Sequence, residues 1–217
     1  MVKYPHIKKV SKCMIAIIDY GAGNLQSVKK ALDFIGAESI ITDNAEKILS
    51  ADKVILPGVG FFGDAMESME RNNLTKTVKR CAESGKPFLG ICLGLQLLFD
   101  ESEESPGVKG LGVFKGKIRR FPSDMGLKIP HIGWNSLNIQ QNDTIFKGVP
   151  ENSYVYFVHS YYLEADDIND VAALTNYGID FHSAVGRGNV FATQFHPEKS
   201  GDVGLTILRN FASMEGK

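Results

Sequence analysis

Short hydrophobic runs alternate with amphipathic segments through the first hundred residues of the chain. The runs that we predict to be buried strands are residues 14–18, 39–41, 53–56 and 87–91. Between them apolar residues recur at helical spacing, which predicts helices over residues 24–35, 44–49, 64–70, 74–83 and 93–99. Buried strands that alternate with helices are typical of a parallel sheet covered by helices on both faces.

Polar residues and glycines mark the ends of these predicted elements. Asn24 and Asn44 stand where helix N-caps are expected, and Gly36 stands where the first helix should end. The third strand should end in the turn Pro57-Gly58-Val59-Gly60, because proline and glycine favour turn conformations.

After residue 100 the pattern changes to short strands. The acidic run 101–104 indicates a solvated helix end, and residues 103–112 a charged loop. The predicted later elements are antiparallel strands over 117–121, 136–139, 154–158 and 181–185, a last strand over 190–195 and a helix over 205–211. We therefore predict an α/β fold: a doubly wound, mostly parallel sheet flanked by helices, with antiparallel strands added in the second half.

Length and composition indicate the domain organisation, the possible partners and the cellular compartment. The 217 residues predict a single domain over residues 13–217, preceded by a flexible arm over residues 1–12. A net charge of -1 argues against a nucleic-acid partner and a charged membrane surface, and the apolar run 88–99 is too short to span a bilayer. Three cysteines suit free thiols in a reducing compartment, which predicts a cytoplasmic protein.

The segment Gly90-Ile91-Cys92-Leu93-Gly94 lies where a predicted strand meets a predicted helix. It has the form of a nucleophile elbow with cysteine in place of serine, and the tight turn requires glycine on both sides. A position at the start of a helix also favours the thiolate form of Cys92. The alternative is a buried cysteine between glycines that serve only packing.

A candidate base follows the last predicted strand. His196 and Glu198 stand two residues apart, so a carboxylate can orient an imidazole that accepts the proton of Cys92. The carboxyl edge of one sheet could bring the three residues together. Taken alone, His196 would more often be a solvated or core histidine.

A metal site is the competing interpretation, because His-x-Glu also begins the zinc deaminase signature. That signature continues with a Pro-Cys-x-x-Cys pair, and no cysteine follows Cys92. The other histidines show no ligand spacing, so we expect neither a metal nor an organic cofactor.

Together, several motifs resemble those of the class I, triad-type glutamine amidotransferases. The resemblance covers residues 14–211 and is closest to the glutaminase subunits of imidazole glycerol phosphate synthase. It is carried by Gly90–Gln96 and Phe195–Glu198, and more specifically by Asp19–Asn24, Pro57–Gly60, His131–Asn135, Phe157–Tyr162 and Lys199-Ser200.

The resemblance implies a role for each matching position. The catalytic residues would be Cys92 as nucleophile, His196 as acid and base, and Glu198 as its orienting partner. The positions implied for binding L-glutamine are Gly58, Gln96, His159, Ser160 and Tyr161. Backbone N–H groups of Leu93 and of the turn around Val59 and Gly60 would form the oxyanion hole.

Val59 also suggests that a partner protein regulates the activity. A β-branched residue resists positive φ, so we do not expect this turn to direct an N–H into the site of the isolated chain. We therefore predict low basal glutaminase activity that rises when a partner shifts the turn. The alternative is an ordinary tight turn.

The resemblance implies a partner interface that includes Asn24 and Trp134. Trp134 is the only tryptophan, in a predicted Gly-Trp-Asn turn. Its alternatives are a core aromatic residue and an interface anchor, and the resemblance favours the anchor.

The implied function is a glutaminase subunit that passes ammonia to a (β/α)₈ cyclase subunit, which makes imidazole glycerol phosphate and AICAR in histidine biosynthesis. Three alternatives remain open at this point: an ammonia supplier for another acceptor such as a surface sugar, a stand-alone cysteine hydrolase, and a non-catalytic interaction module.

Overall fold

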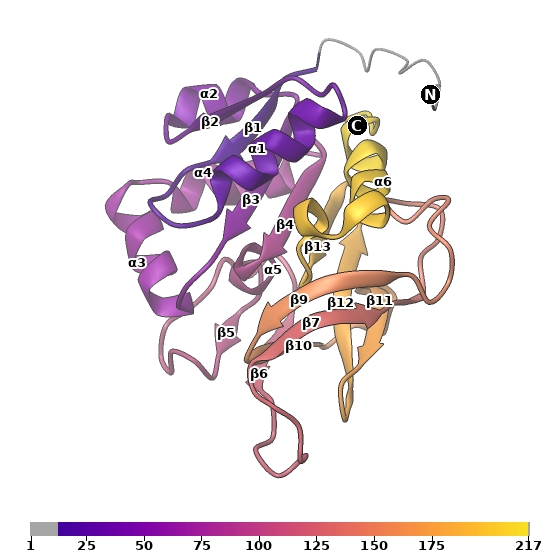
Figure 1. Cartoon of the computed structure of the whole chain (residues 1–217). Helices are drawn as coiled ribbons and strands as arrows, with labels where there is room; N and C mark the ends of the chain where they lie inside the picture. Colours follow the sequence, from indigo (N-terminus) through magenta and orange to yellow (C-terminus); the bar gives the residue numbers. More distant parts are fainter. Residues whose placement is uncertain (1–12, 217) are drawn as a thin grey trace.

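The computed structural model describes residues 13–216, and the arm predicted over residues 1–12 lies outside them. An 11-stranded sheet runs through the molecule in the order β2-β1-β3-β4-β13-β12-β10-β6-β5, with β11 paired to β12 and β8 paired to β11. Figure 1 shows the first hundred residues as a helical half beside a half made mainly of strands. The predicted α/β class is confirmed.

Five strands of this sheet pair in parallel. They are β1 (Ile15–Ile18), β2 (Ser39–Thr42), β3 (Lys53–Gly58), β4 (Phe88–Cys92) and β13 (Val190–Thr193). In β1, Ile15 and Ile17 enter one hydrophobic core, while Ala16 and Ile18 enter another on the opposite face. Successive side chains of a strand point to opposite faces, so burial of both faces explains the continuous apolar runs.

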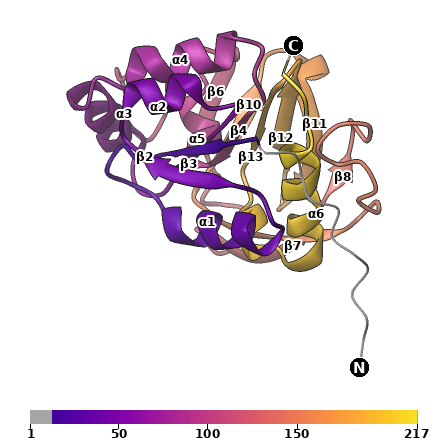
Figure 2. The ribbon, with the colours of Figure 1, turned by 90° about the horizontal axis from the view of Figure 1, so that it is seen from above.

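Helices cover both faces of the parallel strands (Figure 2). On one face lie α1 (Leu25–Phe34) and α6 (Gly201–Ala212); on the other lie α2 (Ala45–Ser50), α3 (Phe62–Arg71) and α4 (Thr75–Glu83). The Asn44 side chain accepts a hydrogen bond from the Lys47 N–H at 3.0 Å, as expected of an N-cap. Asn24 also stands at an N-cap, but its side chain makes no capping hydrogen bond.

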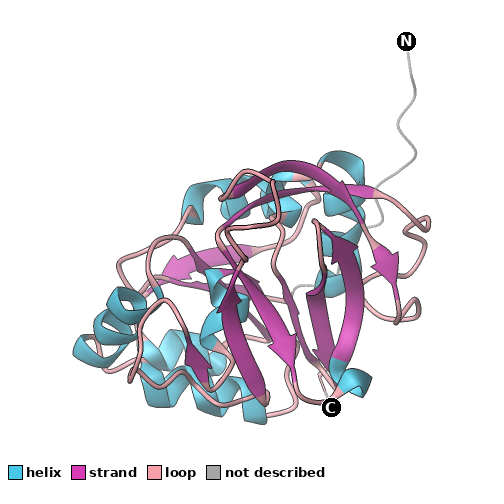
Figure 3. Cartoon of the chain, turned by 90° about the horizontal axis from the view of Figure 1, so that it is seen from below, coloured by secondary structure: helices cyan, strands magenta, loops and turns pink. Residues whose placement is uncertain are grey.

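Antiparallel strands extend the sheet beyond the helices (Figure 3). They are β6 (Gly116–Arg120), β8 (Asn138–Ile139), β10 (Tyr161–Ala165), β11 (Val171–Asn176) and β12 (Asp180–Arg187). A short strand β5 (Glu101–Ser102) pairs with β6 in parallel, and η1 (Ile168–Asp170) and η2 (Pro197–Lys199) are single 3₁₀ turns. The hydrophobic pattern does not predict β11, because its alanines and leucine favour a helix as readily as a strand.

Two predictions about the second half are wrong. The strand β9 (Tyr154–His159) does not join the main sheet but pairs with β7 (His131–Ser136) in a separate antiparallel ribbon. Trp134 lies in this extended strand and not in a turn. Gly133, the residue that suggested a turn, has a φ of 136° yet still pairs with Phe157.

Smaller differences lie close to the candidate site. The third strand continues through Pro57 and Gly58, which pair with Ile91 and Cys92 of β4. The helix α5 (Leu93–Leu97) is shorter than predicted. Within residues 13–216, no helix has both the length and the apolar character needed to cross a membrane.

Because the backbone packs closely around Gly94, one added methyl group there should strongly destabilise the fold. A Cβ built on Gly94 would lie 1.8 Å from the Leu56 carbonyl oxygen of β3, so this strand and α5 could not keep their spacing. We expect Gly94→Ala to lower the free energy of unfolding by about 3 kcal/mol or more, or to prevent folding.

A matched control is available at Gly148. This residue has a φ of 74° but open space around its Cβ position, so Gly148→Ala should cost only about 1–2 kcal/mol of backbone strain. Chemical denaturation of the two variants measures the difference. Equal stabilities would contradict a steric role for Gly94.

Candidate active site

Three neighbouring parallel strands bring the predicted catalytic groups to one sheet edge. Cys92 ends β4, the turn 59–60 follows β3 on one side, and His196 follows β13 on the other. The pairing of Thr193 with Ile91, and of Gly58 with Cys92, sets the register of these strand ends. Parallel strands share their carboxyl edge, and therefore residues more than a hundred positions apart meet there.

Cys92 occupies a strained turn between β4 and α5. Its φ of 55° and ψ of -110° are rare for a residue with a side chain, and strain of this kind concentrates at functional sites. A Cβ on Gly90 would lie 2.9 Å from the Gly94 carbonyl oxygen, so the turn closes too tightly for larger residues. Cys92 is buried but lines a pocket, as a nucleophile elbow requires.

His196 is held by a carboxylate at one ring nitrogen and leaves the other unpaired. Its Nδ1 lies 2.8 Å from Oε1 of Glu198, whose side chain is fully buried. Its Nε2 is buried and has no hydrogen-bond partner among residues 13–216. The Ser200 hydroxyl donates to the His196 carbonyl at 2.6 Å and accepts from the Tyr156 N–H at 3.0 Å, which fixes the turn against β9.

Charges around His196 favour its protonated form. Burial by itself would lower the pKa of this imidazole, but the sulfur charge of Cys92 and the carboxylate of Glu198 outweigh it and raise the pKa to about 10. His196 is thus suited to accept the proton of a neighbouring thiol, and cysteine acts as a nucleophile in its thiolate form.

The turn after β3 faces the sulfur from the side opposite His196. Gly60 has a φ of 100°, whereas Val59 stays outside the left-handed region and is 42% exposed. Val59 thus avoids positive φ, as expected of a β-branched residue, because the neighbouring glycine takes it. Gly58 belongs to β3, and a Cβ there would clash with the Tyr20 hydroxyl at 2.5 Å.

A pocket of roughly 360 Å³ opens above Cys92, within the size range of small-molecule sites. Most of the predicted site residues line it: Val59, Gly60, Cys92, Leu93, Gln96, His159, Ser160, Tyr161 and His196. Glu198 stands behind His196 and does not line the pocket. Asn24 and Trp134 also lie outside its lining.

Two buried glutamine side chains form hydrogen bonds next to the Cys92 sulfur. Gln96 Nε2 donates to the Tyr161 carbonyl at 3.3 Å and to Gln194 Oε1 at 3.1 Å. Gln194 Nε2 then lies 3.9 Å from Cys92 Sγ. No sequence motif indicated a role for Gln194, although it stands two residues before His196 and points to the same site.

Glu104 is a second site residue that sequence reasoning missed. Its carboxylate lines the pocket and accepts a hydrogen bond from the Phe62 N–H at 2.8 Å. Burial raises the pKa of this carboxyl above its ordinary value, against the opposing effect of the Phe62 N–H. The prediction of a solvated helix end over 101–104 is wrong for Glu104, because the loop after β5 folds back toward the start of α3.

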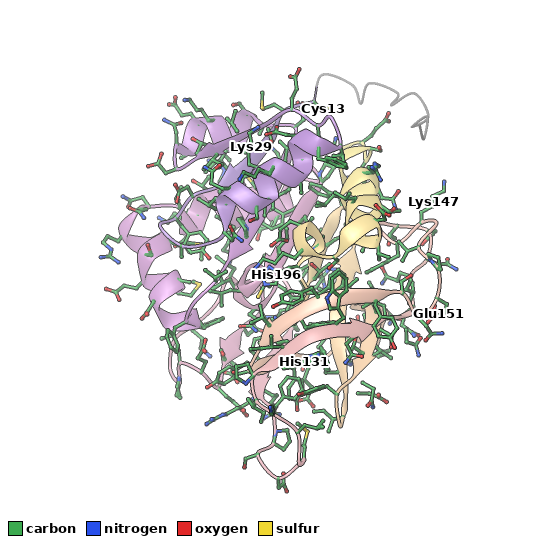
Figure 4. All side chains as sticks on the ribbon, viewed as in Figure 1. Cys13, Lys29, His131, Lys147, Glu151 and His196 are labelled. Atoms are coloured by element: carbon green, nitrogen blue, oxygen red, sulfur yellow. The ribbon has the colours of Figure 1, made fainter. Side chains whose placement is uncertain are left out.

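His159 lines the pocket but uses both ring nitrogens for contacts with protein groups. Its Nδ1 lies 2.8 Å from the Tyr161 carbonyl oxygen and its Nε2 lies 2.9 Å from Nδ1 of His131. Burial lowers the pKa of His131 to about 4 and that of His159 to about 3. Figure 4 shows His131 on the β7–β9 ribbon and His196 between this ribbon and the helical half.

Exposed apolar side chains lie on the outer face of the ribbon. Trp134 is 54% exposed and lies on β7 beside Ile132, while Tyr154 contributes from β9. The Trp134 and Tyr156 rings meet edge to face with centroids 6.1 Å apart. A clustered exposed apolar surface of this kind is typical of a protein interface.

Comparisons with known proteins agree with this geometry. The family model described as Glutamine amidotransferase class-I matches residues 16–214. Imidazole glycerol phosphate synthase subunit HisH of Syntrophotalea carbinolica is 51% identical over 93% of this chain and 100% of its own length. The protein of the same name from Methanocaldococcus jannaschii is 50% identical over 93% of this chain and 100% of its own length.

Solved structures share the fold at lower sequence identity. PurLQS from Thermotoga maritima matches with a TM-score of 0.72 and 24% identity, covering 92% of this chain and 97% of that chain. A second protein from Thermotoga maritima, described as a glutamine amidotransferase, matches with a TM-score of 0.61 and 16% identity, covering 86% of this chain and 76% of that chain.

The buried histidine pair predicts acid-sensitive stability. Because the folded-state pKa values of His131 and His159 lie below the ordinary 6.5, the unfolded chain binds more protons at moderately acid pH. Their contribution to stability is fully present above pH 6.5 and falls as pH decreases from about 6.5 toward 4. Each histidine can add up to about 1.4 kcal/mol per pH unit to this slope.

Chemical denaturation between pH 7 and pH 4.5 measures the slope. The matched variant His131→Phe retains an aromatic ring without a titratable group, so its stability should fall less steeply with acid. An equal slope in both proteins would show that His131 is not held neutral.

Proposed function

The chain belongs to the class-I glutamine amidotransferase family, and we propose that it is the glutaminase subunit of an imidazole glycerol phosphate synthase. It hydrolyses the side-chain amide of L-glutamine to glutamate and ammonia. The ammonia serves histidine biosynthesis, in which a cyclase subunit uses it to make imidazole glycerol phosphate and AICAR.

The arrangement of Cys92, His196 and Glu198 carries this proposal. A cysteine with a φ of 55° stands beside a histidine whose Nδ1 is held by a buried carboxylate and whose Nε2 is unpaired. This is the arrangement of a nucleophile, a base and an orienting acid. Sequence identity of about half over 93% of the chain supports the same reaction.

In the first half-reaction the Cys92 thiolate attacks the carboxamide carbon of glutamine. The carbonyl oxygen becomes an oxyanion, for which the backbone N–H of Leu93 and one N–H of the Val59–Gly60 turn are the proposed donors. His196 donates its Nε2 proton to the leaving nitrogen. The C–N bond breaks, ammonia leaves, and a γ-glutamyl thioester remains on Cys92.

In the second half-reaction water replaces the amine. Neutral His196 removes a proton from water, which attacks the thioester carbon, and the C–S bond breaks to release glutamate and the Cys92 thiolate. Glu198 keeps the Nδ1 proton in place and stabilises the imidazolium in both halves. The raised pKa of His196 restores the ion pair with the thiolate after each turnover.

Pocket residues supply the remaining polar contacts of the substrate. The proposed glutamine-binding positions are Gln96, His159, Ser160 and Tyr161 in the pocket lining, and Gly58, which lies at the end of β3 and outside that lining. Glu104 provides the acidic side chain of the pocket lining, and we assign it to the positively charged α-ammonium group of glutamine.

The exposed ribbon face is the proposed docking site of a (β/α)₈ cyclase subunit in a heterodimer. Trp134 would be its apolar anchor, and Asn24, whose side chain is not used as a helix cap, would contribute from the other half of the molecule. Docking beside the pocket would shift the Val59 turn and raise activity from a low basal rate. A reducing cytoplasm would keep Cys92 as a thiol.

A glutaminase assay with and without the candidate cyclase subunit tests the function. Cys92→Ala should reduce glutamate production by at least ~10³-fold, since the covalent route is lost. Synthesis from added ammonium salts by the same complex should persist, because it does not use the thiol. Trp134→Ala should weaken association of the two subunits in a titration measured by calorimetry.

Cys81→Ala is the matched control for this assay. Cys81 is also a buried cysteine, but it packs in the α4 core away from the pocket. Its variant should retain glutaminase activity. Undiminished hydrolysis by Cys92→Ala, or no hydrolysis by the wild-type complex, would refute the proposed function.

Glu104→Gln tests the assignment of the α-ammonium contact. Glutamine at this position can still accept the Phe62 N–H hydrogen bond, but it lacks the negative charge. We expect the KM for glutamine to rise ~10–100-fold with little change in kcat, as for loss of a charged hydrogen bond.

Glu103→Gln is the neighbouring control. Glu103 is exposed and bonds to Arg119 and to the Arg120 N–H outside the pocket, so its variant should keep the wild-type KM. Equal KM values for the two variants would remove Glu104 from the substrate site.

A further inference from the structure

A continuous series of hydrogen bonds connects the ribbon strand β7 with the catalytic sulfur. It begins at Asn135, whose Nδ2 lies 3.4 Å from Nε2 of His131. His131 Nδ1 lies 2.9 Å from Nε2 of His159, and His159 Nδ1 lies 2.8 Å from the Tyr161 carbonyl oxygen. From Tyr161, the Gln96 and Gln194 amides complete the connection to Cys92.

The protonation of each ring follows from its neighbours. A carbonyl oxygen only accepts, so His159 Nδ1 must carry the proton that it donates to Tyr161. A neutral His159 then accepts at Nε2, which requires His131 to donate from Nδ1. His131 Nε2 is left to accept from the Asn135 amide.

The Asn135 amide is oriented independently of the histidines. Its Nδ2 donates to the Asn176 carbonyl at 2.8 Å, and its Oδ1 accepts from the Ser136 N–H at 2.8 Å. The oxygen cannot exchange places with the nitrogen without losing both bonds. The direction of the hydrogen bonds between Asn135 and the Tyr161 carbonyl is therefore set at the β7 end.

Aromatic packing holds the two rings in place. His131 is stacked against Tyr177, with centroids 3.9 Å apart, and against Phe157 at 4.9 Å. Phe121 and Phe181 contact His159, each with centroids 5.2 Å away. This surrounding disfavours a charged imidazole, so both histidines remain neutral over the working pH range.

At the other end of the series, a second set of donors leads from the Tyr161 carbonyl to the sulfur. The Tyr161 carbonyl accepts from both His159 and Gln96, and the second N–H of Gln96 donates to Gln194 Oε1. This contact turns the amide nitrogen of Gln194, and not its oxygen, toward Cys92 Sγ at 3.9 Å. An N–H donor at that place stabilises a thiolate, whereas an oxygen would repel it.

We propose that His131 and His159 are positioning residues for the thiolate of Cys92. The neutral pair holds the Tyr161 carbonyl in the orientation that aligns Gln96 and Gln194, and so aims an N–H donor at the sulfur. The proposal adds to the glutaminase function proposed above and rests on it. It gives His131 and the ring of His159 a role at the nucleophile, in addition to the glutamine-binding position proposed for His159.

Two substitutions of His131 separate positioning from packing. His131→Phe preserves the stacked ring but removes the donor to His159. His131→Asn leaves part of the ring space empty but places an amide N–H near the former Nδ1. Packing alone predicts that Phe is the better replacement in both stability and activity.

If His131 acts by positioning, stability and activity should rank the two variants in opposite orders. His131→Phe should have the higher Tm, yet its kcat for glutamine, measured with the candidate cyclase subunit, should be ~10-fold or more below that of His131→Asn. A kcat order that follows the Tm order overturns the proposal.

The reactivity of Cys92 gives a readout that needs no glutamine hydrolysis. Alkylation of the Cys92 peptide by iodoacetamide, followed by mass spectrometry across pH, reports the thiolate fraction. The midpoint should move to higher pH in His131→Phe and stay near the wild-type value in His131→Asn. An unchanged midpoint in His131→Phe overturns the proposal.

A third variant keeps the test decisive if substitutions of His131 prevent folding. Gln194→Met retains the side-chain volume but removes the last donor, so it should shift the alkylation midpoint in the same direction, and no shift overturns the proposal. If wild-type protein fails to hydrolyse glutamine, the proposed function is wrong, while the alkylation profiles still decide the role of the histidine pair.

Discussion

The left-handed backbone at Cys92 constrains every other group of the site. Because β4 must turn directly into α5, Gly90 packs too closely against Gly94, and Gly94 against Leu56 of β3, for either to carry a side chain. The sulfur is consequently fixed between the carboxyl ends of β3 and β13. The turn after β3 faces it from one side, and the imidazole of His196 faces it from the other.

Electrostatics divide the buried histidines of the molecule into two kinds. His196 lies beside a sulfur and a carboxylate, and its pKa is raised to about 10. His131 and His159 lie among carbonyl, amide and aromatic groups, and burial lowers their pKa values to about 4 and about 3. The same residue type therefore serves as a charged acid in one place and as a neutral connector in another.

The β7–β9 ribbon lies between the buried histidines and the protein surface. Its outer side exposes Trp134, while its inner side carries His131 and His159 against the main sheet. A partner that contacts the outer side thus lies one strand away from hydrogen bonds that reach Cys92. This arrangement offers a physical route by which docking and nucleophile geometry can be coupled.

The amino-acid sequence alone determined the features that depend on local pattern. Alternating strands and helices, the elbow at Cys92 and the His196–Glu198 pair all follow from spacing over a few residues. Only the tertiary structure decided which distant groups meet: Glu104 at the pocket, Gln194 at the sulfur, His131 at His159, and β7 as a strand of a separate ribbon. These contacts arise from the pairing of segments far apart in the chain, and neither hydrophobic period nor turn chemistry encodes such pairing in any single segment.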